Sequence, residues 1–552
     1  MKKNPIGVDD FKVLVTECYY VDKTRLIEEI INKGSQKIYL FNRPRRFGKS
    51  AIISMLYNFF ANREDNKHLF NDLYIGKTEY FKYCNGYPTI YINNKDFEVD
   101  TFEEMVDRFA YLISKLYLEH QYLLESHLLA EVEKEDFKNI INRKANNTIL
   151  ESALLNLSHY LNRYYNSKVV VLIDEYDSPL TSSYEYGFFD KASRFFKSVY
   201  SQLLKGNYSI YFAVLTGVLK VSKINLFSGL NNLMVDNGIT TYFDEYFGFT
   251  YRETKELLEY FNAGSYYDQI IDWYGGYNFA KKVTNPWSTL SFLFADNVIK
   301  LYWSKTSSND LLDLFYNHIN QSDALNFFSS LINDEKINIQ IDENYNYEDM
   351  DDINTLSNFL VSTGYLSCES TKLDSAFVYI PNLEIKELFK VEVFNRFKKA
   401  TKIENSLISD LKYNLIHQND DKVANNISDV LKSVISYYEF NREEDYQIFM
   451  GTLSALLFNE CNVQREMPSG DGRCDILITP KKGYNFGAII EIKHLSNRIS
   501  IDRLKNTAEA ALNQIIKRNY LDNPLLKNVP NIYIYGVAFY KKNVKVVSKK
   551  IK

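Results

Sequence analysis

The stretch KIYLFNRPRRFGKS, residues 37–50, decides how the first half of the chain folds. KIYLF is a short apolar run, and the residues after RPRRFGKS follow a helical pattern as far as Phe60. We therefore predict a strand, a loop and a helix, which is the context that a phosphate-binding loop requires. In that role the Gly48 backbone approaches the phosphates, Lys49 reaches the β- and γ-phosphates, and Ser50 holds Mg²⁺.

The loop departs from the usual pattern at one position, where Arg43 stands in place of the first glycine. We predict that Arg43 or Arg45 replaces part of the backbone cradle with side-chain charge on phosphate. An ordinary helix start would show the same GKS residues, so the assignment needs support from elsewhere in the chain. The candidate ATP-binding residues of the loop are Arg43, Pro44, Arg45, Arg46, Phe47, Gly48, Lys49 and Ser50.

That support comes from VVVLIDEYD, residues 169–177, an apolar run that ends in acids. Asp174 at the end of a strand can hold the Mg²⁺ shell with Ser50, and Glu175 can orient the attacking water. The acids alone could equally be a solvated strand end, but their order and context agree with a phosphate loop. Thr216, which ends the next strand, is expected beside the γ-phosphate as a polar sensor. An ordinary strand-terminal threonine would look the same.

Strands and helices alternate through the N-terminal part of the chain. Further strands are expected at PTIYIN (88–93) and YSIYFAVLTG (208–217), and a helical segment at 101–165. This alternation predicts a parallel α/β sheet. The continuous apolar runs suit strands that are covered on both faces.

The rest of the chain divides into a mostly helical part and a second α/β part. Residues from about 250 to 395 are mostly helical, with a polar loop at 334–352 and a small hairpin in LVSTGYLSCES and FVYIPNLEIKELF. A helical link follows at about 400–440. The remaining elements that we expect are helices at 445–459 and 501–519 and strands at 462–467, 473–479, 486–493, 531–539 and 543–548.

The second α/β part contains GDGRCDILITPKKGYNFGAIIEIKH, residues 470–494, read as two strands joined by a turn at Pro480–Gly483. Alternate residues of a strand share a face, so Glu491 and Lys493 point the same way. If the two strands pair, Asp475 comes alongside Glu491. Two close carboxylates repel each other unless a cation lies between them, and Mg²⁺ prefers such oxygen ligands.

The remaining chemistry at this strand pair follows from the metal. The Ile492 carbonyl could supply a further ligand, and Lys493 could orient or deprotonate the water that attacks phosphorus. A hairpin whose exposed carboxylates form salt bridges would give the same short pattern, so this alternative stays open.

The bulk properties exclude several classes of protein. The chain of 552 residues is 45% hydrophobic and 24% charged with a net charge of −5, so no global basic field draws it to nucleic acid. Five scattered cysteines form no CxxC pair, which argues against a zinc site or a disulfide framework. The N-terminal residues lack the apolar core of a signal peptide, and no apolar run approaches the roughly 18 residues of a membrane helix. We expect a cytoplasmic protein that does not act in a membrane.

Longer motifs then suggest a family. In chain order they are PIGVDDF (5–11), YYVDKT (19–24), RPRRFGKS (43–50), VLIDEYDSPL (171–180), LTGVLKVSKINLFSGLNNL (215–233), FGFT (247–250), YGGY (274–277), NPWS (285–288), STGYL (362–366) and IPNLEIKELF (380–389). With these motifs the chain resembles the bacterial AAA-ATPase-like family that carries a C-terminal PD-(D/E)XK nuclease domain. The RPRRFGK[ST] loop is that family's own form, so Arg43 is not peculiar to this chain.

The resemblance implies an ATPase core, a helical or winged-helix lid, and a nuclease. The family's nuclease pattern runs E-x(n)-GR-x-D, then E-x-K, then Q. It maps onto Glu466, Arg473, Asp475, Glu491, Lys493 and Gln514. Gln514 could face the metal or simply form local hydrogen bonds.

We therefore expect an α/β chain with a P-loop NTPase domain at 1–260, a lid at 261–400 and a restriction-endonuclease-like domain at 401–552. The expected cofactors are ATP and Mg²⁺, and the expected partners are nucleotide and DNA. The function that follows is an ATPase whose nucleotide state regulates a Mg²⁺-dependent nuclease. The alternative is a nucleotide-dependent switch or scaffold whose C-terminal domain binds nucleic acid without cleaving it. The sequence is also compatible with a homo-oligomer.

Overall fold

The computed structural model describes most of the chain as two compact units. The first unit comprises Met1–Leu311 and Asn338–Glu384, and the second comprises Leu312–Ile337 and Ile385–Lys552. The residues described are 2–34, 37–218, 227, 230–237, 243, 245–279, 281–303, 327, 328, 330–341, 352–370, 375–390, 405–434, 443–458, 461–481, 484–495 and 501–552.

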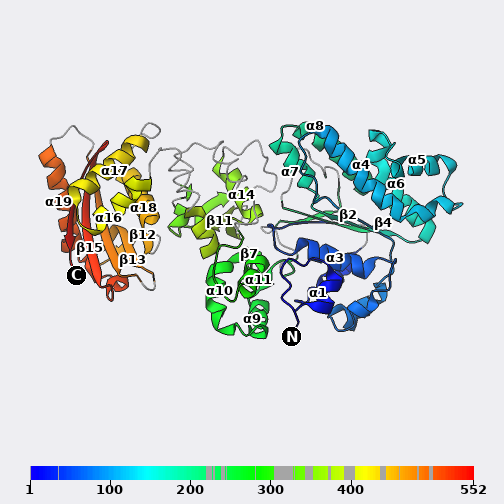
Figure 1. The fold of residues 1–552 in the computed structure, drawn as a ribbon, viewed down its shortest axis with the longest axis horizontal. Coiled ribbons are helices and arrows are strands. Elements are labelled where there is room, and N and C mark those ends of the chain that lie inside the picture. Colours follow the sequence, from blue (N-terminus) through cyan, green and yellow to red (C-terminus); the bar gives the residue numbers. More distant parts are fainter. Residues whose placement is uncertain are drawn as a thin grey trace. The chain divides into compact units, whose positions relative to one another are not determined.

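The core of the first unit is a parallel five-stranded sheet, as predicted (Figure 1). The β3 strand is buried along its whole length, which is typical of a parallel strand covered on both faces. The β4 strand separates β3 from β1, so the strand that carries the acids does not touch the strand that leads into the phosphate loop. In sheet order the strands are β2 (Thr89–Asn93), β3 (Val169–Asp174), β4 (Ile210–Gly217), β1 (Lys37–Asn42) and β5 (Leu233–Asp236).

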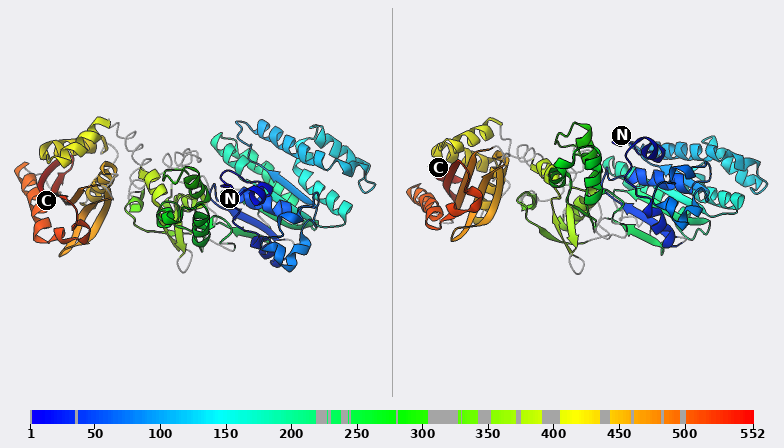
Figure 2. Two further views of the ribbon diagram at one scale, coloured as in Figure 1. Left: turned by 60° about the horizontal axis from the view of Figure 1, so that its bottom comes forward. Right: turned by 90° about the horizontal axis from the view of Figure 1, so that it is seen from below.

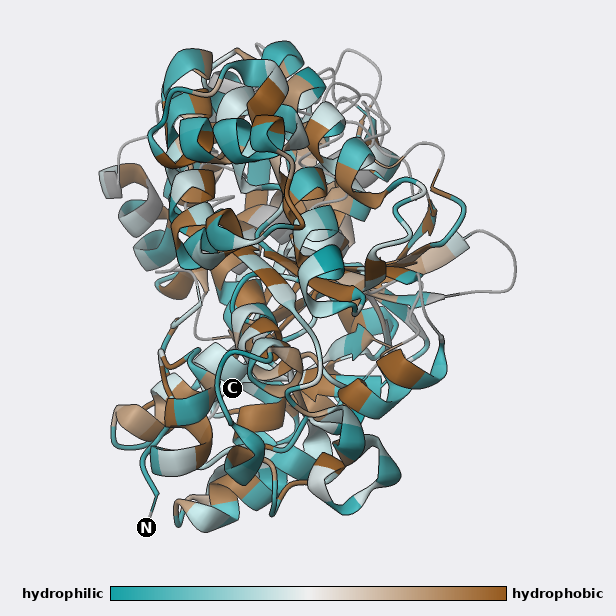
Figure 3. Ribbon diagram, turned by 90° about the vertical axis from the view of Figure 1, so that its right-hand side faces the viewer, coloured by the Kyte–Doolittle hydropathy of each residue, from teal (hydrophilic) through white to brown (hydrophobic). Residues whose placement is uncertain are grey.

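Helices cover both faces of this sheet (Figures 1 and 2). The first three helices pack on one face through a core that includes Phe41, Leu56 and Phe212, and α4, α6 and α8 lie on the other face. Figure 3 shows helices with hydrophobic residues on one side and hydrophilic residues on the other. The helices are α1 (Phe11–Glu17), α2 (Arg25–Asn32), α3 (Lys49–Phe60), α4 (Phe102–Glu119), α5 (Glu131–Ile141), α6 (Asn147–Tyr165), α7 (Ser178–Glu185) and α8 (Phe189–Leu204).

The lid segment adds short helices and two small sheets to the first unit. Residues 261–311 and 338–384 of this segment belong to the first unit, and residues 312–337 and 385–400 belong to the second. The helices of this region are α9 (Tyr251–Tyr260), which comes just before the lid segment, and α10 (Tyr267–Tyr274), α11 (Pro286–Phe294) and α14 (Ile353–Thr363) within it. The strands are β6 (Phe249–Thr250), which also precedes the lid segment, and β7 (Tyr277–Phe279), β8 (Lys281–Thr284), β9 (Ile337–Gln340), β10 (Ser367–Ser370) and β11 (Ser375–Tyr379) within it.

Two features of the lid differ from the prediction. The hairpin of β10 and β11 is confirmed, but β9 joins it as a third strand, so the expected loop at 334–352 was wrong at that point. Ile339 of β9 is buried, which gives a polar stretch one apolar anchor in the sheet. The β6–β8–β7 sheet was not predicted, because strands of two to four residues carry too little periodicity to be recognised.

The second unit is built on a mixed five-stranded sheet in the order β12–β13–β14–β15–β16. Only β14 and β15 run parallel, and α19 makes the crossover between them. The α19 helix covers one face of the sheet, and α16, α17 and α18 cover the other (Figures 1 and 2). The elements are α16 (Asn405–Ile416), α17 (Asp420–Val434), α18 (Glu443–Leu457), β12 (Cys461–Ser469), β13 (Gly472–Pro480), β14 (Phe486–His494), α19 (Ile501–Lys517), β15 (Asn531–Tyr540) and β16 (Asn543–Lys550).

The predicted pairing across the turn at Pro480–Gly483 is confirmed, although residues 482 and 483 lie outside the described part. The β13 and β14 strands are antiparallel, with Ile476 opposite Ile490. One more step in this register brings Asp475 to the level of Glu491.

Short 3₁₀ helices complete the description at Lys67–Leu69, Ile75–Lys77, Glu79–Tyr83, Gln121–Glu125, Gly264–Tyr266, Tyr520–Asp522 and Pro524–Leu526. None of the helices that the structure describes is long and apolar enough to span a membrane.

Candidate functional site

The phosphate loop connects the buried end of β1 to the start of α3. Gly48, directly before the helix, has a φ of +83°, a left-handed conformation that favours glycine. The amide groups in the first turn of α3 have no intrahelical partner, as in any helix, and no side chain caps them. They face the cavity beside the loop. A helix N-terminus of this kind attracts anions.

Lys49 is held inside the loop by the loop itself. Its Nζ donates to the carbonyl oxygens of Arg43 at 2.8 Å and Pro44 at 2.9 Å. Burial lowers the pKa of Lys49 to about 8, although the charges of Asp177 and Glu175 oppose that shift. The lysine is therefore positioned at the helix N-terminus with two neutral acceptors.

The acids at the end of β3 lie close to this lysine. Asp174 is fully buried, and its carboxylate accepts from the Thr216 hydroxyl and, at 3.2 Å, from the Asn93 amide. Glu175 has a φ of +53° and lines the cavity. Burial, and then the charge of Asp174, raise the pKa of Glu175. The structure thus brings Asp174, Thr216 and Glu175 together at one edge of the sheet.

The Arg43 side chain points away from the cavity. It is fully buried, forms an ion pair with Asp236 at the end of β5, and donates to the Asp236 carbonyl oxygen at 2.9 Å. Its guanidinium also lies about 5 Å from the rings of Phe247 and Phe279. We therefore withdraw a phosphate contact for the Arg43 side chain, because its charge is already neutralised within the core. Arg45 lines the cavity and keeps that role as a proposal.

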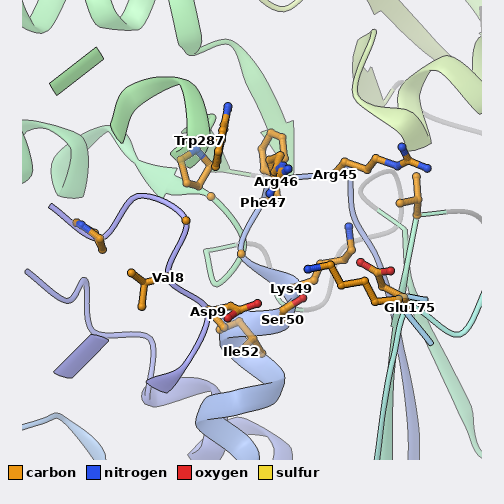
Figure 4. A pocket seen from close by; sticks show the side chains of 18 of the residues that line it. Val8, Asp9, Arg45, Arg46, Phe47, Lys49, Ser50, Ile52, Glu175 and Trp287 are labelled. Carbon is orange, nitrogen blue, oxygen red and sulfur yellow. The ribbon is translucent and has the colours of Figure 1, made fainter. Parts of the chain in front are cut away.

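The cavity beside the loop has a volume of about 560 Å³, which suits a small-molecule ligand. Of the predicted residues, Arg45, Arg46, Phe47, Gly48, Lys49, Ser50 and Glu175 line it, whereas Arg43, Pro44, Asp174 and Thr216 do not. Figure 4 shows Lys49, Ser50 and Glu175 grouped together, with Arg46 beside Trp287. The Arg46 guanidinium lies 4.3 Å from the Trp287 ring centroid.

The other walls of the cavity were not predicted. They come from the N-terminal segment, including Pro5 and Gly7, from the loop after β2, including Lys95, from Phe249, and from the lid residue Trp287. Parts of these walls coincide with the motifs PIGVDDF, FGFT and NPWS. The spacing of those motifs along the sequence does not show that they line a cavity. The lid also holds the loop through the Trp303 indole, which donates to the Arg45 carbonyl oxygen at 3.3 Å.

The second candidate site lies on β13 and β14. Asp475 is 7% exposed and Glu491 is 1% exposed. Asp475 accepts from the Ile492 N–H at 2.6 Å and from the Gln447 amide of α18 at 2.9 Å. Burial raises the pKa of Glu491 to about 7, and the nearby charge of Asp475 adds to the effect. These two acids are buried, so they do not form the exposed salt-bridged hairpin of the alternative interpretation.

Lys493 and Gln514 contact the same glutamate. Lys493 Nζ lies 3.3 Å from Glu491 Oε1, and the Gln514 amide of α19 donates to that oxygen as well. Burial alone would lower the pKa of Lys493, but the charges of Glu491 and Glu443 outweigh it and raise that pKa. Arg473 is exposed in β13. Glu466 belongs to β12, and its side chain lies outside the described part.

The donor set suits a hard divalent cation. Glu491 Oε2 is buried without a hydrogen-bond partner, so an acceptor of high charge density is left unsatisfied next to a second carboxylate. Carboxylate oxygens are the ligands that Mg²⁺ prefers. No group of three or more His, Cys, Asp or Glu side chains is arranged for a metal among the described residues. Backbone oxygen, water or substrate would have to complete the shell, as is usual for Mg²⁺.

Comparisons with known proteins find a match for each part of the chain that contains a candidate site. Residues 5–227 match a family model described as "Predicted AAA-ATPase", and residues 441–549 match one described as "PD-(D/E)XK nuclease superfamily". The chain is also 28% identical over 315 residues to an uncharacterized protein in the vnfD 5′ region of Azotobacter chroococcum mcd 1. That match covers 56% of this chain and 55% of the relative, so it spans about half the length of each.

Proposed function

We propose, from the premise that this chain carries an AAA-ATPase-like domain followed by a PD-(D/E)XK nuclease superfamily domain, that it binds and hydrolyses ATP and that its nucleotide state regulates a Mg²⁺-dependent nuclease acting on DNA. The observation that carries the proposal is the buried, partly unsatisfied Glu491 beside Asp475 and Lys493. Burying an unsatisfied carboxylate beside a second acid costs free energy unless a proton or a cation neutralises it, and in our proposal a Mg²⁺ ion does so.

In the nucleotide site, the amides of α3 and Lys49 would bind the β- and γ-phosphates. Ser50 and Asp174 would hold the Mg²⁺, which would neutralise charge on the phosphates. Glu175 would orient the attacking water, with Thr216 close by through Asp174. The apolar walls supplied by the N-terminal segment and the lid would take the base and sugar.

In the nuclease site, Asp475, Glu491 and the Ile492 carbonyl would hold Mg²⁺, which would stabilise charge on the phosphodiester. Lys493 would orient the attacking water beside the metal. Gln514 would keep Glu491 in place, and Arg473 and Glu466 would be accessory residues.

Hydrogen bonds within the first unit suggest a route for regulation. Ser288, next to Trp287 in the cavity wall, donates to Glu384 Oε2 at 2.7 Å, and the Trp303 N–H donates to Oε1 at 2.8 Å. Trp303 in turn holds the Arg45 carbonyl of the phosphate loop. Glu384 is the last residue of the first unit along the chain. A change at the cavity would thus reach one of the two points where the chain passes into the second unit.

The experiment that tests the proposal incubates supercoiled plasmid with the full chain, Mg²⁺ or Mn²⁺, and either ATP or no nucleotide. We expect nicking that needs the divalent cation, depends on ATP in the wild type and loses that dependence in Lys49→Ala. ATP hydrolysis is measured in parallel, and it should be much slower in Glu175→Gln. Plasmid binding without cleavage under every condition would instead favour the switch or scaffold.

A further inference from the structure

We infer that Glu443, the first residue of α18, is a positioning residue that holds Lys493 and so frees Glu491 to bind a divalent cation. The inference rests on the proposed nuclease function, and it concerns a residue outside the D–E–K pattern. The α18 helix packs against β12 and β14. Glu443 and Gln447 are four residues apart on it, so they lie on the same face.

The contacts place Lys493 between two carboxylates. Its Nζ lies 3.3 Å from Glu491 Oε1 and 3.4 Å from Glu443 Oε1. The second Glu443 oxygen, Oε2, accepts from the His494 N–H at 3.0 Å. The hydrogen bond from the His494 backbone therefore fixes the Glu443 carboxylate at the end of β14. The ammonium of Lys493 lies beside that carboxylate.

The contact between Glu443 and Lys493 matters because Lys493 and a bound cation would compete for Glu491. A cation bound by Asp475 and Glu491 would repel the ammonium of Lys493 and would take over the charge of Glu491. In the described part of the chain Lys493 forms two ion pairs, and the pair with Glu443 is the one that remains when Glu491 binds the cation. Glu443 thus supplies the counter-charge that keeps the ammonium in the site.

Gln447 gives independent support that this face of α18 serves the site. Its amide donates to Asp475 Oδ1 at 2.9 Å in a buried position. One turn of helix therefore orients both Lys493 and Asp475, while Gln514 of α19 orients Glu491 from another element. The oxygen that stays unpartnered is Glu491 Oε2, where a cation would bind.

A double-mutant cycle in Mn²⁺ affinity tests the inference on the full chain without nucleotide. Calorimetric titration of Asp475→Asn provides the blank for cations bound elsewhere. Glu443→Gln removes the charge but keeps an acceptor for the His494 N–H, and we expect about fivefold weaker Mn²⁺ binding, since Lys493 then competes for Glu491. Lys493→Met should bind Mn²⁺ at least as tightly as the wild type. In that background Glu443→Gln should have no further effect.

A matched control is Glu509→Gln, which removes one acid of α19 whose ion pair with Lys505 is 4.0 Å long. It should leave Mn²⁺ binding unchanged. An equal loss from Glu443→Gln in both backgrounds would make Glu443 a cation ligand and overturn the positioning role. Unchanged Mn²⁺ affinity with a lower melting temperature would leave it only a structural role.

Two further outcomes also count against the inference. If Glu443→Gln does not fold, weaker Mn²⁺ binding by Lys493→Met than by the wild type refutes the competition by itself. If the wild type binds no more Mn²⁺ than Asp475→Asn, the metal site of the proposed function fails, and the inference falls with it. Intact Mn²⁺ binding without the predicted coupling overturns the inference alone.

Discussion

The phosphate-loop cavity and the acidic strand pair are built in opposite ways, the first around backbone amides and a lysine and the second around two carboxylates. The first draws on consecutive residues, Gly48 to Ser50, whose backbone and helix N-terminus attract an anion. The second collects Asp475, Glu491 and their supporting amides from separate strands and helices. In this chain the candidate anion site is thus made locally from backbone, whereas the candidate cation site uses side chains that only the packed fold brings together.

Two buried glutamates, Glu384 and Glu491, differ in whether their carboxylate oxygens have hydrogen-bond partners. Burial raises the pKa of both Glu384 and Glu491 to about 7. Glu384 receives hydrogen bonds from Ser288 and from the N–H groups of Tyr302 and Trp303, so both of its oxygens are satisfied. Glu491 has one oxygen without a partner. We interpret the first as a structural link and the second as a ligand.

The largest effect is expected from Asp475→Ala. Removing one of the two carboxylate ligands should lower plasmid cleavage by about a thousandfold and abolish Mn²⁺ binding at the site. Lys493→Ala should lower cleavage to a similar degree but leave Mn²⁺ bound. The matched control is Asp471→Ala, an exposed aspartate in the preceding turn, which should cleave like the wild type. Cleavage by Asp475→Ala at the wild-type rate would remove the strand pair from the chemistry.

At the anion site, Lys49→Ala should weaken ATP binding by about 10- to 100-fold, since it removes the buried cation next to the phosphates. Fluorescent ATP analogues or calorimetry can measure this affinity. Lys95 also lines the cavity but is exposed, and Lys95→Ala should change the affinity by no more than a few-fold. Equal losses in the two variants would show that Lys49 acts only through net charge.

Glu384, whose two oxygens both accept hydrogen bonds, should make the stability of the first unit depend on pH. The pKa of Glu384 is raised in the folded state, so its stabilising contribution is complete below pH 4.5 and is lost as pH rises through about 7. Glu384→Gln should remove this dependence, worth about 2 kcal/mol between pH 5 and pH 8. Denaturation can be followed by tryptophan fluorescence, because Trp273, Trp287 and Trp303 all lie in the first unit. If the stability of the wild type and of Glu384→Gln changed with pH in the same way, Glu384 would not be the group responsible.

Glu491, which has one oxygen without a hydrogen-bond partner, should instead make the stability of the protein depend on Mg²⁺. At about ten times its Kd, Mg²⁺ should stabilise the wild type by about 1.4 kcal/mol, which is a rise of a few degrees in melting temperature. Glu491→Gln should lose this shift, and Glu384→Gln should keep it. Circular dichroism without nucleotide is the measurement. The same shift in both variants would erase the distinction between the two glutamates.

The smallest effect separates Arg43 of the loop from Arg45. Arg45→Ala should weaken ATP binding about two- to fivefold at low salt and less at high salt, since ions screen a partly exposed charge on phosphate. Arg43→Ala should instead lower stability, because it leaves Asp236 buried without its ion pair. An Arg43 variant of normal stability with salt-sensitive loss of ATP affinity would restore the original prediction.

The sequence by itself determined the features that depend on neighbouring residues. KIYLFNRPRRFGKS predicted strand, loop and helix, because apolar runs, a helical pattern and Gly48 are local signals. The register of β13 and β14 was also predictable, since a short turn fixes which residues face each other. The structure confirms both, together with the parallel sheet of the first unit.

The tertiary structure alone decided which charges are already neutralised and which remain available. Arg43 pairs with Asp236, 193 residues away, and no pattern within the loop could reveal this partner. Gln447 and Glu443 reach the acidic strands only because α18 packs on them. Whether a buried charge is satisfied depends on every side chain packed around it, and those contacts are set by the fold rather than by spacing along the chain.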